Sequence, residues 1–281
     1  MPDIWARYLD PSGQLGPNYW FYFARRLVEL ASIPEGGAIL DVGTCDGNVL
    51  FKAMPRAGRL GRGVGIDLYD DDGLQDGLAE RRRLGWENVS FAQMDANCLG
   101  FPGGTFDVVL ANFVGWDDCF DFERMGFIAP DRVMAEMQRV LKPGGQVGIG
   151  GWVEQCDIEW IAAAFRKYLP KRVKGLGERN ISYSKENPEG HKLILQNGGF
   201  ENIRLHVETA TLVSPDAETW WRQMQLAARE YFKQIPDAGE MRRFKDRVFA
   251  DLEAFRFPDG IRFNKIVSFA FGNKSSRVGD I

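Results

Sequence analysis

AILDVGTCDGNVL, residues 38–50, is the stretch of this 281-residue chain that decides its fold. Its apolar first part predicts a buried strand over 38–43, and the residues from 47 onward predict a helix. The turn between them contains Gly43 and Gly47, and glycine lets a ligand approach bare main chain. A helix N-terminus also offers free N–H groups to an anionic ligand. This turn therefore predicts a ligand site, and the rest of the sequence must indicate which ligand.

Strands and helices continue to alternate after this turn. Strands are predicted over 63–68, 89–96, 106–115 and 146–153, with helical patterns between them. Such alternation is typical of an α/β fold with a parallel, doubly wound sheet. The strand over 106–115 is apolar throughout, which indicates burial on both faces of the sheet.

The second half of the chain reads as helices with two further strands. We expect one domain over residues 1–281, because neither a repeat nor a low-complexity linker divides the chain. Its core is expected over 36–152, 195–212 and 261–274. Helical cap segments are expected over 1–34, 153–190 and 214–256.

Composition narrows the class of protein. The net charge of −4 and the pI near 5.4 give no positive field that would collect a phosphate backbone, so we expect no nucleic-acid partner. The chain starts with acidic residues and has no apolar run of the ~18 residues that a membrane helix needs. We therefore expect no signal peptide, no membrane span and a cytoplasmic location.

Cysteine and histidine spacing indicates no metal site. The four cysteines contain no C-x-x-C pair, and His191 and His206 are the two histidines, which do not complete a zinc-site pattern. We expect the cysteines to be buried, reduced thiols. Metal catalysis is therefore not expected.

Polar residues stand at the carboxyl ends of the predicted strands, where doubly wound sheets bind their ligands. Asp67 ends the second strand and suits the two hydroxyls of a ribose. Asp95 and Ala96 end the third strand and offer an acceptor for an exocyclic amine and an N–H for a ring nitrogen. Asn112 and Phe113 stand at the end of the fourth strand and would face the same cleft. With the free amides of the first turn, these groups describe an aminoacyl-adenosine.

A dinucleotide is the nearest competing ligand on this fold. Its fingerprint is G-x-G-x-x-G directly after the first strand, whereas the turn from Gly43 to Gly47 reads G-x-x-x-G. The glycines of GRGVG, residues 61–65, precede a strand and so lie on the wrong side for a phosphate. The adenosyl ligand is therefore favoured.

Four motifs in this region resemble those of the class I S-adenosylmethionine-dependent methyltransferases, specifically the small-molecule branch, methyltransferase type 11, that includes ubiquinone and menaquinone biosynthesis enzymes. ILDVGTCDG resembles the first motif of the family, acidic-x-Gly-x-Gly-x-Gly, and VGIDL resembles the second. MDANCLGFPGGTFDVV resembles the third segment, and RVLKPGG, residues 139–145, is similar to the signature before the fifth strand. The resemblance covers residues 36–152.

The resemblance implies a Rossmann-like sheet of seven strands, mostly parallel, with an antiparallel last strand at 261–274. It implies methyl transfer from S-adenosylmethionine to an oxygen, nitrogen or carbon of a small molecule, in secondary metabolism or quinone-type biosynthesis. Asp67 would then bind the ribose, and Asp95 and Ala96 the adenine. The cofactor-binding residues implied are Asp41, Gly43, Thr44, Cys45, Gly47, Asp67, Leu68, Asp95, Ala96, Asn112 and Phe113.

Cys45 departs from the family pattern, because it stands where the first motif has its middle glycine. A side chain is tolerated there where φ is negative, and it would narrow the approach to the methionine portion of the cofactor. We expect bound S-adenosylmethionine to protect Cys45 from thiol alkylation.

Methyl transfer from a sulfonium chiefly needs alignment, and it needs a base only where the nucleophile must lose a proton. The sequence offers Asp117, Asp118 and His191 as candidates for a base or substrate anchor, with solvated or structural roles left open. Aromatic residues of the cap segments, Trp221 among them, are expected in the core or around an aromatic or apolar acceptor such as a phenol. Both a monomer and a homodimer remain open.

Two other functions remain open. A member of this fold could keep the cofactor and catalyse a non-transfer reaction such as a cyclisation. A macromolecular methyltransferase is the other, but Asn112-Phe113-Val114-Gly115 lacks the Asn/Asp-Pro-Pro-aromatic tetrad of nucleobase amino-group methylation. The acidic pI also argues against RNA.

Overall fold

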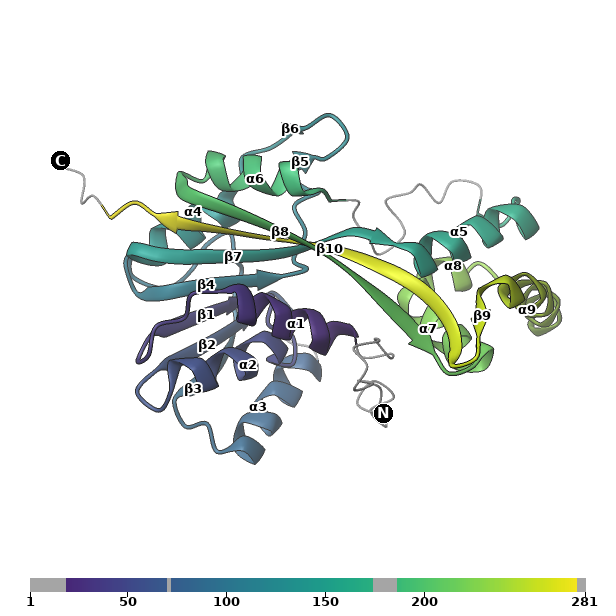
Figure 1. Cartoon of the computed structure of the whole chain (residues 1–281), viewed down its shortest axis with the longest axis horizontal. Helices are drawn as coiled ribbons and strands as arrows, with labels where there is room; N and C mark the ends of the chain where they lie inside the picture. Colours follow the sequence, from purple (N-terminus) through teal and green to yellow (C-terminus); the bar gives the residue numbers. More distant parts are fainter. Residues whose placement is uncertain (1–18, 70–71, 174–185, 277–281) are drawn as a thin grey trace. The chain divides into compact units, whose positions relative to one another are not determined.

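Five parallel strands form the part of the sheet at whose ends most of the predicted cofactor residues lie. The computed structural model describes residues 19–69, 72–173 and 186–276. The five parallel strands pair in the order β3-β2-β1-β4-β7 (Figure 1), so strand order reverses between β1 and β4. Doubly wound sheets bind ligands beyond the strand ends at such a switch point. The parallel strands are β1 (Ala38–Val42), β2 (Arg62–Asp67), β3 (Val89–Gln93), β4 (Phe106–Asn112) and β7 (Leu141–Gln155).

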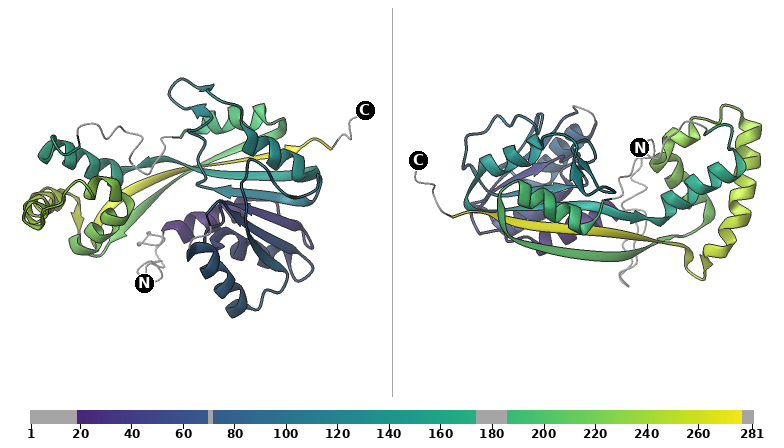
Figure 2. Two further views of the ribbon diagram at one scale, coloured as in Figure 1. Left: turned by 180° about the vertical axis from the view of Figure 1, so that it is seen from behind. Right: turned by 90° about the horizontal axis from the view of Figure 1, so that it is seen from above.

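Two long strands complete the sheet. β10 (Gly260–Lys274) lies next to β7, and β8 (Phe200–Ser214) forms the edge. β10 runs against β7 and β8, as the arrows show (Figures 1 and 2). The predicted sheet of seven strands, mostly parallel with an antiparallel last strand, is therefore confirmed. The two-residue β9 (Arg256–Phe257) pairs antiparallel with β10 as an eighth strand.

The segments between the strands form helices because their apolar residues recur at helical spacing. In α4, Met134, Met137 and Val140 recur on one face and are buried. Asp131 begins this helix by accepting a hydrogen bond from the Met134 N–H at 2.8 Å, which fixes the helix start next to the strand ends. The helices beside the parallel strands are α1 (Tyr19–Leu30), α2 (Asn48–Ala57), α3 (Asp72–Leu84), α4 (Arg132–Val140) and α6 (Pro188–Asn197).

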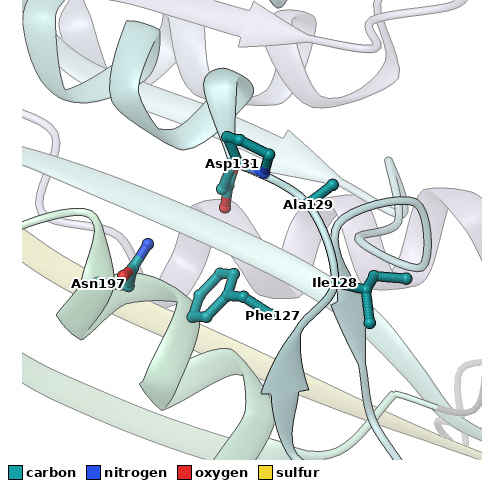
Figure 3. A pocket seen from close by; sticks show the side chains of 6 residues that line it. Phe127, Ile128, Ala129, Asp131 and Asn197 are labelled. Atoms are coloured by element: carbon teal, nitrogen blue, oxygen red, sulfur yellow. The ribbon is translucent and has the colours of Figure 1, made fainter.

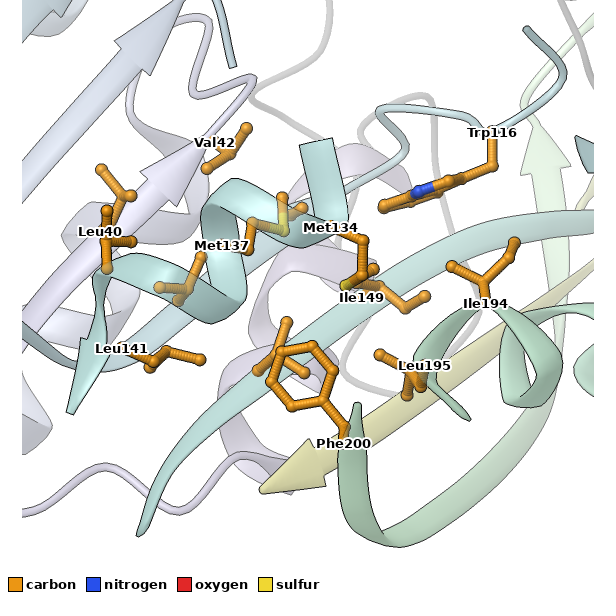
Figure 4. Close-up of a cluster of buried hydrophobic side chains, with 14 of the residues drawn as sticks. Leu40, Val42, Trp116, Met134, Met137, Leu141, Ile149, Ile194, Leu195 and Phe200 are labelled. Atoms are coloured by element: carbon orange, nitrogen blue, oxygen red, sulfur yellow. The ribbon is translucent and has the colours of Figure 1, made fainter. Parts of the chain in front are cut away.

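One hydrophobic core joins α4 and α6 to a face of the sheet. Leu40 and Val42, two apart on β1, point to this face because side chains alternate along a strand. Trp116, from the segment after β4, is buried in the same core, so packing anchors that segment. Figure 4 shows these residues together with Met134, Met137, Leu141, Ile149, Ile194, Leu195 and Phe200.

The chain forms two compact units. The sheet unit, as we call it, comprises the described residues of Trp20–Gly151, Glu186–Val207 and Val267–Ile281. The helical unit comprises Tyr19 and the described residues of Trp152–Lys185 and Glu208–Ile266. Its helices are α5 (Cys156–Tyr168), α7 (Ala217–Ala227), α8 (Arg229–Phe232) and α9 (Ala238–Leu252), and a 3-10 turn covers Glu253–Phe255.

The helical unit has a hydrophobic core of its own. Trp220 and Trp221 of α7 are buried in it together with Phe165 of α5 and Phe244 of α9. The ring centroids of Trp221 and Phe232 lie 4.9 Å apart in an edge-on arrangement. Of the two places expected for Trp221, the core and an acceptor pocket, the structure places it in the core.

A buried ion pair also lies in the helical unit. The Lys265 Nζ of β10 lies 2.7 Å from the Asp157 Oδ1 in the first turn of α5, and neither side chain is exposed. The same Nζ lies 4.5 Å and 5.4 Å from the ring centroids of Tyr19 and Trp152. Burial lowers the pKa of Lys265, while the neighbouring Asp157 opposes the shift. The pair ties a strand of the sheet to a helix.

One element between β4 and α4 was not predicted. It is a hairpin of two short strands, β5 (Phe120–Asp121) and β6 (Gly126–Phe127). Across the described ranges, no helix is long and apolar enough to cross a membrane.

Candidate active site

A cavity of about 490 Å³ opens at the carboxyl ends of β1, β2, β3 and β4, within the sheet unit. This volume lies in the range of small-ligand sites, roughly 300–1,000 Å³. The residues singled out from the sequence that line it are Gly43, Asp67, Leu68, Asp95, Ala96, Phe113, Asp117 and Asp118. Those outside its lining are Asp41, Thr44, Cys45, Gly47, Asn112 and His191.

The turn after β1 is fixed by hydrogen bonds and by glycine. The Thr44 N–H donates to the Ile66 carbonyl at 2.9 Å, which joins the turn to β2. Gly43 has a φ of +68°, and a Cβ there would lie 2.8 Å from the Val114 side chain, so the position requires glycine. Gly47 has a φ of +84° and begins α2. The turn therefore presents bare main chain to the cavity at Gly43.

Asp41 braces this turn without lining the cavity. Its buried Oδ2 accepts hydrogen bonds from the Thr44 hydroxyl at 2.6 Å and from the Leu50 N–H at 3.2 Å. Burial raises the pKa of Asp41 to about 7, although these two hydrogen bonds oppose the shift. The neighbouring carboxylates of Asp46 and Asp67 raise it further.

Cys45 has a φ of +49°, in the left-handed region. We expected a side chain to be tolerated at this position with a negative φ, and the structure does not show that conformation. The backbone keeps the conformation that suits glycine, at a cost of roughly 1–2 kcal/mol for a side chain. Its N–H donates to the Asp67 Oδ2 at 2.9 Å. Cys45 and Cys98 are exposed, so the prediction of buried thiols is wrong for both, whereas Cys119 is buried and Cys156 is half-buried.

Two carboxylates reach the cavity from neighbouring strands. Asp67 ends β2, and its Oδ1 accepts a hydrogen bond from the Tyr69 N–H at 3.3 Å. Asp95 follows β3 and is exposed, and its Oδ1 accepts from the main-chain and side-chain N–H groups of Asn97 at 2.8 and 2.9 Å. These bonds lower the pKa of Asp95, so it is ionised at neutral pH. An ionised carboxylate has about four acceptor positions, so Asp95 keeps capacity for a ligand.

Asn112 ends β4 and Phe113 follows it, but their side chains lie in different places. Phe113 has a φ of +60° and lines the cavity. Asn112 lies against β7, because a Cβ at Gly150 would lie 2.3 Å from the Asn112 Oδ1. This oxygen is buried, and no described residue forms a hydrogen bond with it. The structure therefore brings Phe113 into the cavity and leaves Asn112 behind it.

The donors and acceptors of the cavity fit an adenosyl ligand. Asp67 and Asp95 supply anionic acceptors for hydroxyl and amine groups, and Gly43 supplies bare main chain. Among the described lining residues, Arg132 is the single basic one. A pyrophosphate would meet mostly carboxylates here, whereas a sulfonium compound with a ribose and an adenine finds suitable partners.

The segment between β4 and α4 forms an acidic wall of the cavity, which we define as Trp116–Cys119. Asp117 and Asp118 are exposed in it. Burial, with help from the nearby carboxylates, raises the pKa of the Cys119 thiol to about 12. Of the candidates for a base or anchor, Asp117 and Asp118 are therefore exposed in the lining of the cavity. The Cys119 thiol beside them stays protonated.

A second pocket of about 400 Å³ lies beside the β5–β6 hairpin. Figure 3 shows the Phe127 ring with Asp131 and Asn197 around it. Pro130 and Asp131 line both this pocket and the larger cavity. None of the residues singled out from the sequence lines this second pocket.

His191 lies outside the cavity in a buried pair with Glu186. Its Nε2 lies 2.8 Å from the Glu186 Oε2, and both side chains are inaccessible. Of the roles left open for His191, a solvent-exposed one is therefore excluded. The structure does not bring His191 together with Asp117 and Asp118 in the cavity lining.

Several residues of the site were not identified from the sequence. Tyr69 and Met94 line the cavity next to the strand-end residues, so their position alone could have identified them. Asp131 is the N-cap residue of α4, where an N-cap signal could have marked it. Trp116 and Glu186 carry no local pattern that indicates their roles.

Comparison with known proteins covers most of the chain. A family model described as a methyltransferase domain matches residues 33–168. Nocamycin O-methyltransferase of Saccharothrix syringae is 30% identical over 216 residues, which cover 72% of this chain and 73% of that protein. The ubiquinone/menaquinone biosynthesis C-methyltransferase UbiE of Enterobacter sp. (strain 638) is 27% identical, and the match covers 68% of this chain and 76% of that protein.

A solved structure shares the fold. The crystal structure of the 4+2 cyclase SpnF superposes with a TM-score of 0.54 at 20% sequence identity. The match covers 92% of this chain and 82% of that one. At this identity the likeness concerns the fold alone.

Proposed function

Because the chain belongs to the class I S-adenosylmethionine-dependent methyltransferases, we propose that it transfers the methyl group of S-adenosylmethionine to a small-molecule acceptor in the cavity described above. The observation that carries this proposal is the gathering of Gly43, Asp67 and Asp95 from three strand ends around one cavity of about 490 Å³.

In this proposal, each strand end recognises one part of the donor. Asp67 accepts hydrogen bonds from the ribose hydroxyls, and Asp95 accepts one from the adenine amine. The Ala96 N–H faces the adenine ring. Gly43 lets the amino-acid end lie against main chain, and Asp41 keeps that turn in place through its bonds to Thr44 and Leu50.

The residues of the cavity have to align the reactants. S-adenosylmethionine supplies, when bound, a methyl group on a positively charged sulfur. Phe113 and Trp116 line the cavity and would exclude water from the line of approach. Asp117 and Asp118 are the exposed acceptors that would orient a hydroxyl or take its proton.

We place the acceptor among planar, apolar compounds of the phenol or quinol class. Two relatives support a small molecule, since one is named for O-methylation of nocamycin and the other for C-methylation in quinone biosynthesis. Phe113, Val114 and Trp116 give the cavity an apolar stretch beside the acidic wall. The likeness to SpnF concerns the fold and lends no support to a cyclisation.

Calorimetric titration with S-adenosylhomocysteine tests the donor site. Asp67→Asn keeps the side-chain size but removes the charge and one acceptor oxygen. We expect the affinity to fall by about 10- to 100-fold, which corresponds to about 1.5–3 kcal/mol for a lost bond to a charged group. Asp76→Asn makes the same change at an exposed carboxylate of α3 and should leave the affinity unaltered. Equal affinities in both variants and the wild type would contradict the proposed site.

Product analysis tests the transfer itself. The protein is incubated with S-adenosylmethionine and a panel of phenols, hydroquinones, amines and carboxylic acids. We expect S-adenosylhomocysteine to form with a phenol or hydroquinone, together with a methylated product detected by mass spectrometry. Methylation of amines or acids alone would overturn the proposed acceptor class, and a rearranged product formed without consumption of the donor would overturn methyl transfer.

A further inference from the structure

Glu186 and His191 form a buried pair that the proposed transfer does not use. Their side chains are 1% and 0% exposed, and the Glu186 Oε2 lies 2.8 Å from the His191 Nε2. These two atoms form a hydrogen bond inside the fold. Polar groups are costly to bury, so a pair at this depth calls for a reason.

The second oxygen of Glu186 reaches the acidic wall of the cavity. The main-chain N–H of Trp116 donates to the Glu186 Oε1 at 3.3 Å. Trp116 lines the cavity, and its carbonyl accepts hydrogen bonds from the N–H groups of Cys119 and Phe120 at 3.1 and 2.8 Å. Glu186 is therefore hydrogen-bonded to Trp116, the residue whose carbonyl holds the turn of this wall.

The surrounding backbone is shaped around the pair. A Cβ at Gly151 would lie 1.5 Å from the Glu186 Oε2 and 2.7 Å from the His191 Nε2, so glycine alone leaves room for the carboxylate. The Phe122 ring packs edge-on against the His191 ring with centroids 5.8 Å apart. These contacts indicate a defined seat for the pair.

A neighbouring residue makes a second connection to the same segment. Asn187 begins α6 by accepting a hydrogen bond from the Gly190 N–H at 2.7 Å, and its side-chain amide donates to the Phe122 carbonyl at 3.1 Å. The start of α6 thus holds the chain at Trp116 and at Phe122. Asp117 and Asp118 lie between these two points.

We propose that Glu186 and His191 are positioning residues that hold the Trp116–Cys119 wall in the arrangement that captures the acceptor. This inference rests on the proposed function, because it assigns that wall to the acceptor. The donor contacts proposed for Asp67 and Asp95 come from β2 and β3, whereas the pair bonds to the segment after β4. The pair should therefore control acceptor binding more than donor binding.

Four variants separate positioning from general stability. Glu186→Ala removes both bonds of the carboxylate, whereas Glu186→Gln keeps its shape and an oxygen for the Trp116 N–H. His191→Ala removes the ring and leaves the carboxylate. Glu189→Ala is the matched control, because Glu189 is exposed on the same helix and pairs with Lys192.

Two measurements read the position of the wall. Hydrogen exchange of the peptide covering 113–120 reports the wall, and calorimetry with S-adenosylhomocysteine reports the donor site. We expect Glu186→Ala and His191→Ala to exchange faster in this peptide and to raise the KM of the phenol or hydroquinone found in the panel by about tenfold. Affinity for S-adenosylhomocysteine should stay at the wild-type value. Glu186→Gln should restore both properties, and Glu189→Ala should match the wild type.

Wild-type exchange at 113–120 in Glu186→Ala would overturn the inference, as would equal losses of donor and acceptor binding. If Glu186→Ala does not fold, His191→Ala and the rescue by Glu186→Gln decide the question in the same way. The exchange measurement needs no acceptor. If the protein binds S-adenosylhomocysteine but methylates no compound of the panel, that result contradicts the proposed function. Hydrogen exchange at 113–120 still tests the present inference in that case.

Discussion

The Asp41 carboxyl group is a hydrogen-bond acceptor for the turn after β1. The Thr44 hydroxyl and the Leu50 N–H both donate to its Oδ2, and an uncharged oxygen could accept them equally well. Burial disfavours the ionised form, which is why the pKa of Asp41 rises to about 7. The residue therefore combines a structural bond with an electrostatic cost that depends on pH.

Asp41→Asn should remove this pH dependence. The folded-state pKa lies above the unfolded value of 3.8, so the native state holds the proton more tightly, and this stabilisation is complete below about pH 4 and is lost as the pH rises toward 7. The loss corresponds to at most about 4 kcal/mol. In urea denaturation, the free energy of unfolding of Asp41→Asn should therefore rise relative to that of the wild type between pH 4 and pH 8. A constant difference across that range would contradict the expectation, and Asp76→Asn serves as the exposed control.

The backbone conformation of Cys45 is a feature that the sequence motif did not predict. The spacing of glycines in residues 38–50 predicted the turn, and the comparisons support the family that it indicated. The φ of +49° is found together with a long-range bond, from the Cys45 N–H to the Asp67 Oδ2. A contact between residues of two different strand ends has no signature in a local pattern.

At the scale of elements, the Lys265–Asp157 pair fastens β10 to α5. Lys265→Met leaves the Asp157 carboxylate buried without its cation, so we expect a loss of about 3–5 kcal/mol in the free energy of unfolding. Lys265→Met combined with Asp157→Leu removes both charges and should recover most of that loss. Urea denaturation of the single and double variants measures this. A double variant no more stable than Lys265→Met would show that the unpaired charge is not the cause.

Elements with a long pattern were predicted, and short ones were not. The apolar run of β4 is long enough to stand out in the sequence, so this strand was predicted within a few residues of its ends. β5 and β6 have two residues each, which is too short for any period. This hairpin stands beside the acidic wall, so part of the site was beyond prediction for the same reason. Trp116 and Glu186 meet across 70 positions of sequence, a contact that a single chain does not reveal.

At the scale of the whole molecule, ligand effects should be confined to the sheet unit. Every residue that lines the cavity belongs to that unit, and each unit has its own hydrophobic core. S-adenosylhomocysteine at about 100 times its Kd would stabilise the state that binds it by about 2.7 kcal/mol. We expect slower hydrogen exchange at 43–47, 67–69, 94–97 and 113–118, with α7 and α9 unchanged. Equal slowing in α7 and α9 would contradict this expectation.

The division of the chain into two units was not apparent in the sequence pattern. The pattern predicted helical segments over 153–190 and 214–256, and much of each described range is helical. It did not indicate that these helices would share a core among themselves, because periodicity shows that a face is buried and not what covers it. We retain the sheet core over 36–152 as the part that holds the proposed site.

The order in which the units alternate has a consequence for engineering. The chain leaves the sheet unit after Gly151, re-enters it at Glu186, leaves it after Val207 and re-enters it at Val267. No single truncation can excise the helical unit, and a chimera with a relative would have to exchange both inserts at once, since α5 of the first and α7 and α9 of the second build one core. Exchanging one insert alone would pack α5 of one protein against α7 and α9 of the other, in a core whose side chains no longer fit together.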